Sequence, residues 1–369
     1  MRVLVLTASY GSGHNAAARS LAGAFQAAGA TVIVVDHFCE LVHPAFDRVT
    51  RALYAAVLRR APALWGLAYG IGDRLSSDSP WAFGMPCVGV RGLGRLLDTL
   101  GPDAVVSVHA TPAVALSTLA QRGRRIPPHT TVVTDFVAHS QWIAPGVDRY
   151  CVAAEEVKHE FVARGIAADR VIVTGVPVRA GFEVPLDPLT ARRALGLSPD
   201  LPVVLAMAGA QGSFGRLRDV ARALTDAGTP LQGLVVTGHD VELADRLRRL
   251  TAGQGIRVYG FVDDVRPLMA AADLLVSKAG GMTLAEALAA ELPLLTYGSL
   301  PGQERRNERF ASRAGIALVA RRQRELGRAL ERALTEPKLL DRLRRQMRRV
   351  RRPDASRHIV SLVLERAVA

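Results

Sequence analysis

Two short blocks of the sequence combine glycines with polar side chains in a pattern that suits a phosphorylated sugar. The first block, Ser277 to Glu286, places Gly280 and Gly281 directly behind the apolar residues 274–276. A glycine loop that opens a helix aims free backbone N–H groups and the positive end of the helix dipole at an anion. Glu286 follows about one helical turn later, where its carboxylate can accept hydrogen bonds from two vicinal hydroxyls.

The second block, residues 301–307, adds the polar side chains of Gln303, Glu304 and Asn307, which suit sugar hydroxyls. Phosphate, ribose and hexose recognition would then fall within one short stretch, so the two blocks together predict a nucleotide-sugar site. A plain α/β loop would need Gly280 only for its turn, and this alternative stays open.

The elements that must position these blocks alternate between strand and helix along nearly the whole chain. The expected strands are Val3–Thr7, Thr31–Val35, Ala104–Val108, Thr131–Thr134, Tyr150–Ala153, Val171–Thr174, Val203–Met207, Leu234–Thr237, Ile256–Tyr259, Leu274–Ser277, Pro293–Thr296 and Ile316–Val319. Apolar strands with helices between them indicate parallel sheets that are covered on both faces. We therefore expect an α/β fold of two doubly wound, Rossmann-like domains, with ligands bound at the carboxyl ends of the strands in the cleft between the domains.

The chain of 369 residues is long enough for two full cores, and its 49% hydrophobic content argues against disorder. We expect an N-terminal domain at residues 1–178, a proline-containing linker at 179–200 and a C-terminal domain at 201–345. A last helix is expected within 346–369, and packing back on the N-terminal domain is one arrangement open to it.

The cysteines and the N-terminal residues indicate the cellular compartment in which the protein is expected. Cys39, Cys87 and Cys151 are far apart and form no CxxC pair, so neither a disulfide framework nor a metal site is expected, and a reducing cytoplasm is the natural home. The apolar run at residues 1–7 is brief and leads into a glycine loop, which favours a buried strand over a signal peptide. No apolar stretch is long enough to span a bilayer, so we expect a soluble or peripheral protein.

The first loop offers a rival interpretation. Residues 11–16 match G-x-G-x-x-A, and Asp36 lies at the end of the second expected strand, where a dinucleotide-binding domain places its ribose-binding acid. An NAD- or FAD-dependent oxidoreductase is therefore an alternative. Against it, the loop is longer than a tight dinucleotide turn, and His14 stands where a close backbone approach favours a small side chain. The second domain also carries the better phosphate and sugar pattern.

The net charge of +13 is concentrated near the C-terminus, where residues 321–352 hold thirteen Arg or Lys against four Asp or Glu. Leucines at helical spacing accompany them, and such a basic amphipathic surface fits nucleic acid, an anionic membrane or a plain solvated face. No nucleic-acid-binding motif is present, so we expect no nucleic-acid partner.

A second region with membrane character lies between Pro44 and Leu100, where the strand–helix alternation lapses. Apolar and aromatic residues are interleaved there with Arg51, Arg59, Arg60 and Arg74; they are Leu53, Tyr54, Val57, Leu58, Leu64, Trp65, Leu67, Tyr69, Trp81, Phe83 and Met85. This combination suits the headgroup boundary of an anionic bilayer. The alternative is an ordinary helical insertion whose apolar face is buried in the core.

Motifs that occur in order between Val3 and about Arg313 resemble the diacylglycerol glycosyltransferases. They are TASYGSGH (7–14), TDFVAHSQW (134–142), TGVPVR (174–179), MAGAQG (207–212) and the block 278–307. This family includes the bacterial processive diacylglycerol glucosyltransferases and the plant monogalactosyldiacylglycerol synthases. The Gly-Gly and Pro-Gly-Gln parts are shared with the peptidoglycan lipid-intermediate N-acetylglucosaminyltransferase. The resemblance implies a GT-B fold, an inverting transfer from a UDP-sugar to a membrane lipid, docking through the N-terminal domain, and chemistry without a metal ion.

The resemblance assigns His14 as the base that takes the acceptor's proton, since a pKa of about 6.5 suits proton transfer near neutral pH. Asp135 would orient that base or contact the acceptor. Each residue has a structural alternative, because His14 could cap the helix that it opens and Asp135 could form a cap or a turn. His109 also ends a strand and could line the acceptor side, again with a structural role as the alternative.

On the donor side, the resemblance implies that the charge of the leaving diphosphate is stabilised by backbone groups. Gly209 and Ala210, in the turn after an expected strand, would supply some of these donors. The helix start at Gly280 and Gly281 would supply the others. No cofactor is implied beyond the UDP-sugar, which is the donor substrate.

The rest of the donor set surrounds these loops. Phe261 and Val262 match the position where related enzymes hold uracil through backbone groups, Glu286 would bind the ribose, and Gln303 with Glu304 the hexose. The set is completed by Gly238, Lys278, Thr283, Pro301, Gly302 and Asn307. A solvated residue at a strand end is the alternative for Lys278.

We therefore expect an enzyme that transfers a hexose from a UDP-sugar to diacylglycerol on the inner face of the cytoplasmic membrane. UDP-glucose is the favoured donor and UDP-galactose the alternative, while the number of sugars added stays open. A polyprenyl-linked or other lipid acceptor, or a nucleotide-sugar sensor with little turnover, are the alternatives for the function.

Overall fold

The computed structural model describes residues 1–9, 12–75, 88–209 and 216–368. The chain divides into two compact units. The first unit comprises Met1–Ala180, Pro301–Gln303 and Arg352–Ala369, and the second comprises Gly181–Leu300 and Glu304–Arg351. The chain therefore passes from the first unit into the second and returns to the first near its end.

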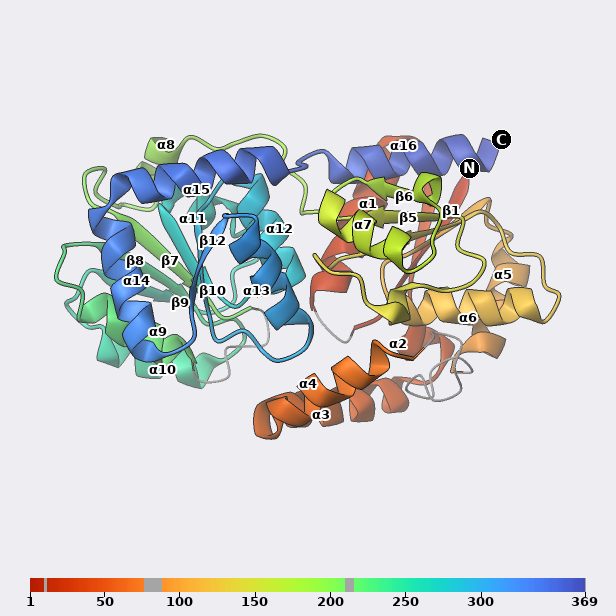
Figure 1. The fold of residues 1–369 in the computed structure, drawn as a ribbon, viewed down its shortest axis with the longest axis horizontal. Helices are drawn as coiled ribbons and strands as arrows, with labels where there is room; N and C mark the ends of the chain where they lie inside the picture. Colours follow the sequence, from red (N-terminus) through yellow and green to blue (C-terminus); the bar gives the residue numbers. More distant parts are fainter. Residues whose placement is uncertain (10–11, 76–87, 210–215, 369) are drawn as a thin grey trace. The chain divides into compact units, whose positions relative to one another are not determined.

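The first unit is built on a parallel six-stranded sheet in the order β2-β1-β3-β4-β5-β6 (Figure 1). Its strands are β1 (Arg2–Thr7), β2 (Thr31–Asp36), β3 (Ala104–Ser107), β4 (His129–Val132), β5 (Arg149–Val152) and β6 (Val171–Val173). Its helices are α1 (Ser12–Ala27), α2 (His37–Leu41), α3 (Pro44–Arg60), α4 (Pro62–Gly72), α5 (Val90–Leu100), α6 (Ala110–Gln121), α7 (Glu155–Ala163) and α16 (Ala355–Val368), with short 3-10 turns η1 (Ser140–Trp142) and η2 (Ala168–Arg170).

Both faces of this sheet are covered at β1, which explains the apolar run of residues 3–6. On one face, Val3 and Val5 pack with α1 and α16 in a single core cluster. On the other face, Leu4 and Leu6 pack with α5 and α6. Because successive strand residues point to opposite faces, β1 contributes to both cores at once.

The second unit has the same plan, with a parallel sheet in the order β12-β11-β10-β7-β8-β9. Its strands are β7 (Val203–Met207), β8 (Gln232–Val236), β9 (Ile256–Tyr259), β10 (Leu274–Ser277), β11 (Leu294–Tyr297) and β12 (Ala317–Ala320). Its helices are α8 (Pro188–Ala194), α9 (Arg216–Thr225), α10 (Val241–Leu250), α11 (Arg266–Ala271), α12 (Gly281–Ala289), α13 (Gln303–Arg313), α14 (Gln323–Thr335) and α15 (Pro337–Val350). Helix α13 takes its first residue from the part grouped with the first unit.

The predicted α/β fold of two doubly wound sheets is confirmed, and the element boundaries differ in detail. The strand expected at Thr131–Thr134 lies two residues earlier, as β4, because its pairing with β3 begins at His129. Helix α15 runs through residue 345 to Val350, and a separate helix, α16, follows. The segment at 179–200, expected as a linker, contains α8.

Asp36, the basis of the dinucleotide alternative, caps a helix. Its carboxylate accepts hydrogen bonds from the backbone N–H groups of Phe38 and Cys39, at 3.1 and 3.0 Å, and from the Ser9 hydroxyl. Asp36 therefore has a structural role that accounts for its position at the end of β2.

Candidate functional site

His14 stands in the first turn of α1, beside the carboxyl ends of β3 and β4. Its Nδ1 lies 2.8 Å from the carbonyl oxygen of Val108 and 3.1 Å from Oγ1 of Thr134. A carbonyl oxygen only accepts hydrogen bonds, so Nδ1 carries the proton of the neutral ring. The fixed tautomer leaves the lone pair on Nε2, which is the nitrogen that could accept a proton.

The surroundings of the His14 ring set its protonation. Burial lowers the pKa of His14, while the carboxylate of Asp135 and the hydrogen bond to Val108 raise it in part. The ring of His109 meets that of His14 edge-on at 4.7 Å, and Trp142 lies 6.1 Å away. His14 is therefore neutral at neutral pH, which is the form that a general base requires.

His109, Thr134, Asp135 and Trp142 lie around His14. We call these five residues the His14 cluster. Nδ1 of His109 accepts the backbone N–H of Thr111 at 3.1 Å and so caps α6. Burial lowers the pKa of His109 well below its usual range, with the nearby rings of His14 and His37 adding to the effect. Asp135 is buried just after β4, and its negative charge raises the pKa of His14.

The glycine loop of the second unit follows β10 and opens α12, as the sequence indicated. Its position is fixed by side chains, because Ser299 Oγ accepts the N–H of Ala279 at 3.2 Å and Asn307 Nδ2 donates to the Ala279 carbonyl at 3.1 Å. Gly281 begins the helix, and the amides of the first turn, which includes Thr283, cannot bond within it. The loop thus holds a row of N–H groups at the positive end of a helix dipole.

Gly280 has an ordinary backbone conformation, with φ of −69° and ψ of 143°. Among the described residues, an added Cβ would meet only the Thr283 hydroxyl, at 3.9 Å, which is normal van der Waals contact. Neither the turn nor the packing of the described residues therefore requires glycine at this position. A glycine here leaves the space outside the loop open.

Lys278 and Glu304 join the two blocks of the sequence. Lys278 Nζ lies 2.5 Å from Glu304 Oε1, and Glu304 Oε2 accepts the N–H of Leu300 at 2.8 Å. Both carboxylate oxygens thus hold neighbouring parts of the protein. Glu286 and Asn307 are also buried, on α12 and α13.

Four further candidates lie in loops at the carboxyl ends of β7, β8 and β9. Gly209 and Gly238 have φ of 76° and 68°, a region that favours glycine. Phe261 is 47% exposed and stacks flat on His239, with centroids 4.3 Å apart and an interplanar angle of 8°. Val262, which follows it, is half-buried.

The remaining candidates divide between described and undescribed parts of the chain. Pro301 and Gly302 precede α13, Gly302 with φ of 94°, and Gln303 is its first residue. All three are grouped with the first unit, whereas Glu304 and Asn307 belong to the second. Predicted residues that lie outside the described ranges are Ala210 of the diphosphate set, Gly11, Trp81, Phe83, Met85 and Cys87.

The described part of the membrane-like segment forms the helices α3 and α4, which pack against each other (Figure 1). Apolar side chains that point to solvent include Val49, Leu53, Leu64, Leu67 and Ile71, each more than half exposed. Arg51, Arg59 and Arg60 are exposed on α3. Leu58 and Tyr69 of the predicted set are instead buried, so the apolar residues of the hairpin formed by α3 and α4 divide between its surface and the interior.

Neither a membrane-spanning helix nor a metal-binding cluster is found in the described residues. In the described ranges, no helix is long and apolar enough to cross a membrane, and no group of three or more His, Cys, Asp or Glu is arranged to hold a metal ion. The leucines of α14 and α15 pack into the second core, and many of the arginines between them are exposed. The basic stretch at 321–352 thus has the form of a solvated helical face.

Comparison with known proteins gives matches along both units. The model of monogalactosyldiacylglycerol (MGDG) synthase matches residues 14–178, and that of the glycosyltransferase family 28 C-terminal domain matches residues 204–358. A processive diacylglycerol beta-glucosyltransferase of Bacillus cytotoxicus is 33% identical over 368 residues, which cover 99% of this chain and 93% of the relative. The enzyme of the same description from Bacillus mycoides is 32% identical over 98% of this chain and 93% of the relative.

The chain belongs to the diacylglycerol glycosyltransferase family. Solved structures at lower identity add the fold alone. MurG of Acinetobacter baumannii has a TM-score of 0.67 at 15% identity, with 99% of both chains covered. The co-structure of S. aureus MnaA with UDP has a TM-score of 0.66 at 12% identity, covering 97% of this chain and 94% of that one. The fold of this diacylglycerol glycosyltransferase family member is GT-B, as the resemblance implied.

The structure places several residues of this family member in the site that were not predicted from the sequence. Thr134 and Trp142 lie inside a motif that the sequence had indicated, but nothing in the sequence placed them beside His14. Ser299 and His239 were not singled out at all. For Thr134, His239 and Ser299 the signal that could have found them is their position, two or three residues after the carboxyl end of a parallel strand.

Proposed function

We propose that this chain transfers a hexose, glucose in the first instance, from a UDP-sugar to diacylglycerol at the inner face of the cytoplasmic membrane. The observation that carries the proposal is the 33% identity to a processive diacylglycerol beta-glucosyltransferase over 99% of this chain. That likeness spans the His14 cluster and the glycine loop together. The geometry of both is compatible with the chemistry that the proposal needs.

The second unit would hold the donor. Backbone N–H groups of the first turn of α12, with the helix dipole behind them, would meet the charge of the diphosphate. Glu286 would bind the ribose, the loop at Phe261 and Val262 the uracil, and Gln303 with Glu304 the hexose. Among the described residues, nothing in the backbone or the packing requires glycine at Gly280, and this supports a close approach of the diphosphate there.

The first unit would activate the acceptor. Nε2 of His14 takes the proton of the acceptor hydroxyl as its oxygen attacks the anomeric carbon from the face opposite the UDP. The bond from the anomeric carbon to the diphosphate oxygen breaks, UDP leaves with the electron pair, and the configuration is inverted. The carboxylate of Asp135 stabilises the imidazolium that forms, consistent with its effect on the pKa of His14.

The apolar side of the hairpin formed by α3 and α4 would touch the membrane. Leu64 and Leu67 of α4 are 59% and 62% exposed, and α3 carries exposed arginines, a combination that suits an anionic surface. Replacing both leucines by serine should weaken partitioning into vesicles that contain an anionic phospholipid. Val241→Ser, at a site 68% exposed on α10, is the matched control. Unchanged partitioning of the double variant would defeat this part of the proposal.

The first experiment offers UDP-glucose, UDP-galactose and UDP-N-acetylglucosamine separately, with anionic liposomes that contain diacylglycerol, and resolves the lipid products by mass. A hexosyl-diacylglycerol supports the proposal and names the donor, and a ladder of hexoses reveals processivity. Binding of UDP without a lipid product from any donor would overturn it in favour of a polyprenyl-linked or other acceptor, or of a sensor.

A further inference from the structure

A pocket of about 400 Å³ lies in the second unit, at the amino ends of β10 and β11. Its walls come from residues 181–188, from the carboxyl ends of α11 and α12, and from α15. The glycine loop and its neighbours stand at the carboxyl ends of the same strands, and no residue of the predicted donor set lines the pocket. Its volume falls in the range of sites for small molecules, so it is a second candidate site in this unit.

The apolar part of the pocket's lining, which we call its aliphatic floor, is aliphatic apart from Phe182. Phe182, Met269 and Leu292 are buried in its walls, whereas Val184 and Leu186 are 69% and 44% exposed. Two large apolar side chains thus face water next to an apolar hollow. A ligand with a hydrocarbon chain would cover them and gain the free energy of removing that surface from water.

The rim of the pocket brings two guanidinium groups to one carboxylate. Nε of Arg348 lies 2.5 Å from Glu291, and Arg351 pairs with the other oxygen of the same carboxylate. All three residues line the pocket. The trio therefore carries one net positive charge, and a guanidinium can share its several N–H donors between Glu291 and a bound anion.

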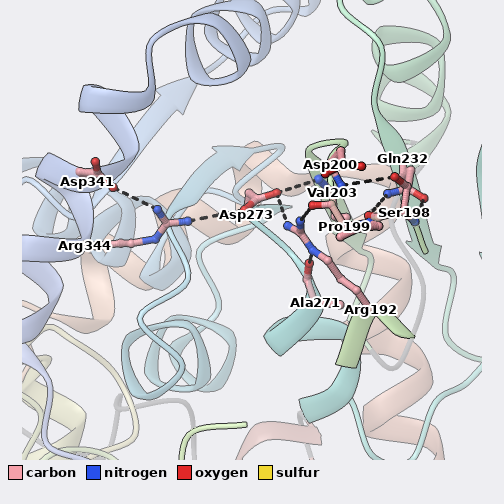
Figure 2. A network of polar contacts seen from close by, with 10 residues as sticks. All are labelled: Arg192, Ser198, Pro199, Asp200, Val203, Gln232, Ala271, Asp273, Asp341 and Arg344. Carbon is pink, nitrogen blue, oxygen red and sulfur yellow. Dashed lines mark hydrogen bonds and ion pairs between the residues drawn. The ribbon is translucent and has the colours of Figure 1, made fainter. Parts of the chain in front are cut away.

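The other charges along the rim already hold the fold together. Figure 2 shows Asp273 bonded to Arg192 at 2.6 Å, with Arg344 between Asp273, at 3.8 Å, and Asp341, at 3.2 Å. Arg266 pairs with Asp264 at 2.7 Å. At the Arg348–Glu291–Arg351 trio, by contrast, two arginines share one carboxylate.

Helix ends do not account for this trio. The last carbonyl of α11, that of Ala271, accepts a hydrogen bond from Arg192 Nε at 3.0 Å (Figure 2). The end of α12 is closed by backbone bonds from the N–H groups of Glu291 and Leu292 to carbonyls of the last turn. Arg348 and Arg351 are thus not needed to cap either helix.

The backbone conformation of Glu291 indicates that its carboxylate is kept in the trio at an energetic cost. Among the described residues Glu291 is the single non-glycine with positive φ, at 52°. This is the position after a helix where glycine is usual, and another residue there costs roughly 1 kcal/mol or more. A glycine would remove that strain but also the carboxylate that holds both arginines at the pocket mouth.

We propose that this pocket binds an aliphatic chain with a single anionic head group, a carboxylate or a phosphate ester. The head group lies at Arg348 and Arg351, and the chain covers Leu186 and extends over Met269. This ligand is neither the sugar donor nor the lipid acceptor, so the proposal goes beyond the function proposed above and does not depend on it.

The test is isothermal titration of the full chain with decanoate, decyl phosphate, decanol and inorganic phosphate, each below its aggregation limit. Both decyl anions should bind, decanol at least about tenfold more weakly for want of a charge-assisted hydrogen bond, and phosphate not measurably. Equal binding of decanol would overturn the role of the trio. Equal binding of phosphate would overturn the role of the aliphatic floor, and no binding of either decyl anion would overturn the whole proposal.

Two variants locate the binding. Arg351→Gln should weaken decanoate about tenfold, whereas Arg345→Gln, an exposed position on the same helix that does not line the pocket, should leave it unchanged. Ala270→Phe fills the pocket and should abolish binding, provided that its thermal unfolding matches that of the parent chain. Equal losses in Arg351→Gln and Arg345→Gln would place the ligand elsewhere, and this pair decides even where Ala270→Phe does not fold.

Discussion

The His14 cluster of the first unit and the glycine loop of the second unit are held in place in opposite ways. In the first unit the backbone holds a side chain, because the carbonyl of Val108 fixes the ring of His14. In the second unit side chains hold a backbone loop, because Asn307 and Ser299 fix Ala279 from both of its polar groups. The difference matches what each site has to do in the proposed reaction.

Proton transfer requires one nitrogen with a defined tautomer and a suitable pKa, whereas anion binding requires an array of N–H groups that never titrate. The distribution of histidine follows the same division. Eight of the nine histidines lie in parts of the chain that belong to the first unit, and His239 is the exception. We therefore expect substitutions in the first unit to alter rate and pH dependence, and those in the second to alter affinity and stability.

The largest expected effect is that of His14→Ala. Losing a general base should lower kcat by about 10²- to 10⁴-fold, while UDP binding by the second unit stays unchanged. Rates are measured by product mass and UDP affinity by calorimetry. His159→Ala, an exposed position on α7, is the control. Near-normal turnover of His14→Ala would show that His14 is not the general base, and the contrast between the two units would then no longer hold.

Asn307→Leu tests the second half of the contrast. It takes the side-chain donor from the buried Ala279 carbonyl, which should cost about 1–3 kcal/mol of unfolding free energy and raise the KM for the UDP-sugar about tenfold. Steady-state kinetics and urea unfolding measure the two effects. The exposed Arg309→Gln on the same helix is the control. A fall in kcat at constant KM would instead give Asn307 a part in the chemistry.

Acid should destabilise the first unit through His129. Burial lowers the pKa of His129 to about 3, so below pH 6.5 the unfolded chain binds a proton that the folded one does not. Stability falls as the pH drops from 6.5 toward 3, by up to about 1.4 kcal/mol per pH unit. All three tryptophans lie in the first 180 residues, so their fluorescence in urea reports this unit. His129→Gln should flatten the dependence, and an identical slope would contradict the assignment.

The smallest effect is expected from Asp135→Asn. Burial places the pKa of His14 below 6.5, so kcat/KM should fall as the pH drops through that lowered value. The negative charge of Asp135 raises the pKa of His14, and its removal should move the acid limb of the profile to lower pH. A limb that stays in place, or moves to higher pH, would show that Asp135 does not act through His14.

The sequence was sufficient to predict the sheets because their strands are buried on both faces and therefore read as continuous apolar runs. The prediction of strands was weakest where the apolar run is interrupted by polar residues. Strand β4 begins at His129 and contains two threonines, so its start is set by pairing with β3 rather than by hydrophobicity. The glycine loop was predictable for a similar reason, since a strand, two glycines and a helix follow one another locally.

The partners that tune these groups could not be predicted, because they come from distant parts of the chain. The carbonyl that fixes His14 is 94 residues away, and Asn307 contacts a residue 28 positions before it. A backbone carbonyl has no residue type to recognise in a sequence. The pocket at the amino ends of β10 and β11 was missed as well. Residues 181–188, which form one of its walls, were predicted to be part of a linker.

The return of the chain to the first unit affects the order in which the protein is completed during synthesis. Helix α16 supplies Ile359, Val360 and Val363 to the core that contains Val3 and Val5, and Arg149 bonds to the Leu362 carbonyl. The first unit leaves the ribosome first but lacks part of its core until the last residues have emerged. The second unit, nearly contiguous in sequence, can finish folding before it. A ribosome that stalls near residue 350 would thus release a chain with its second unit nearly complete and its first unit open to proteolysis.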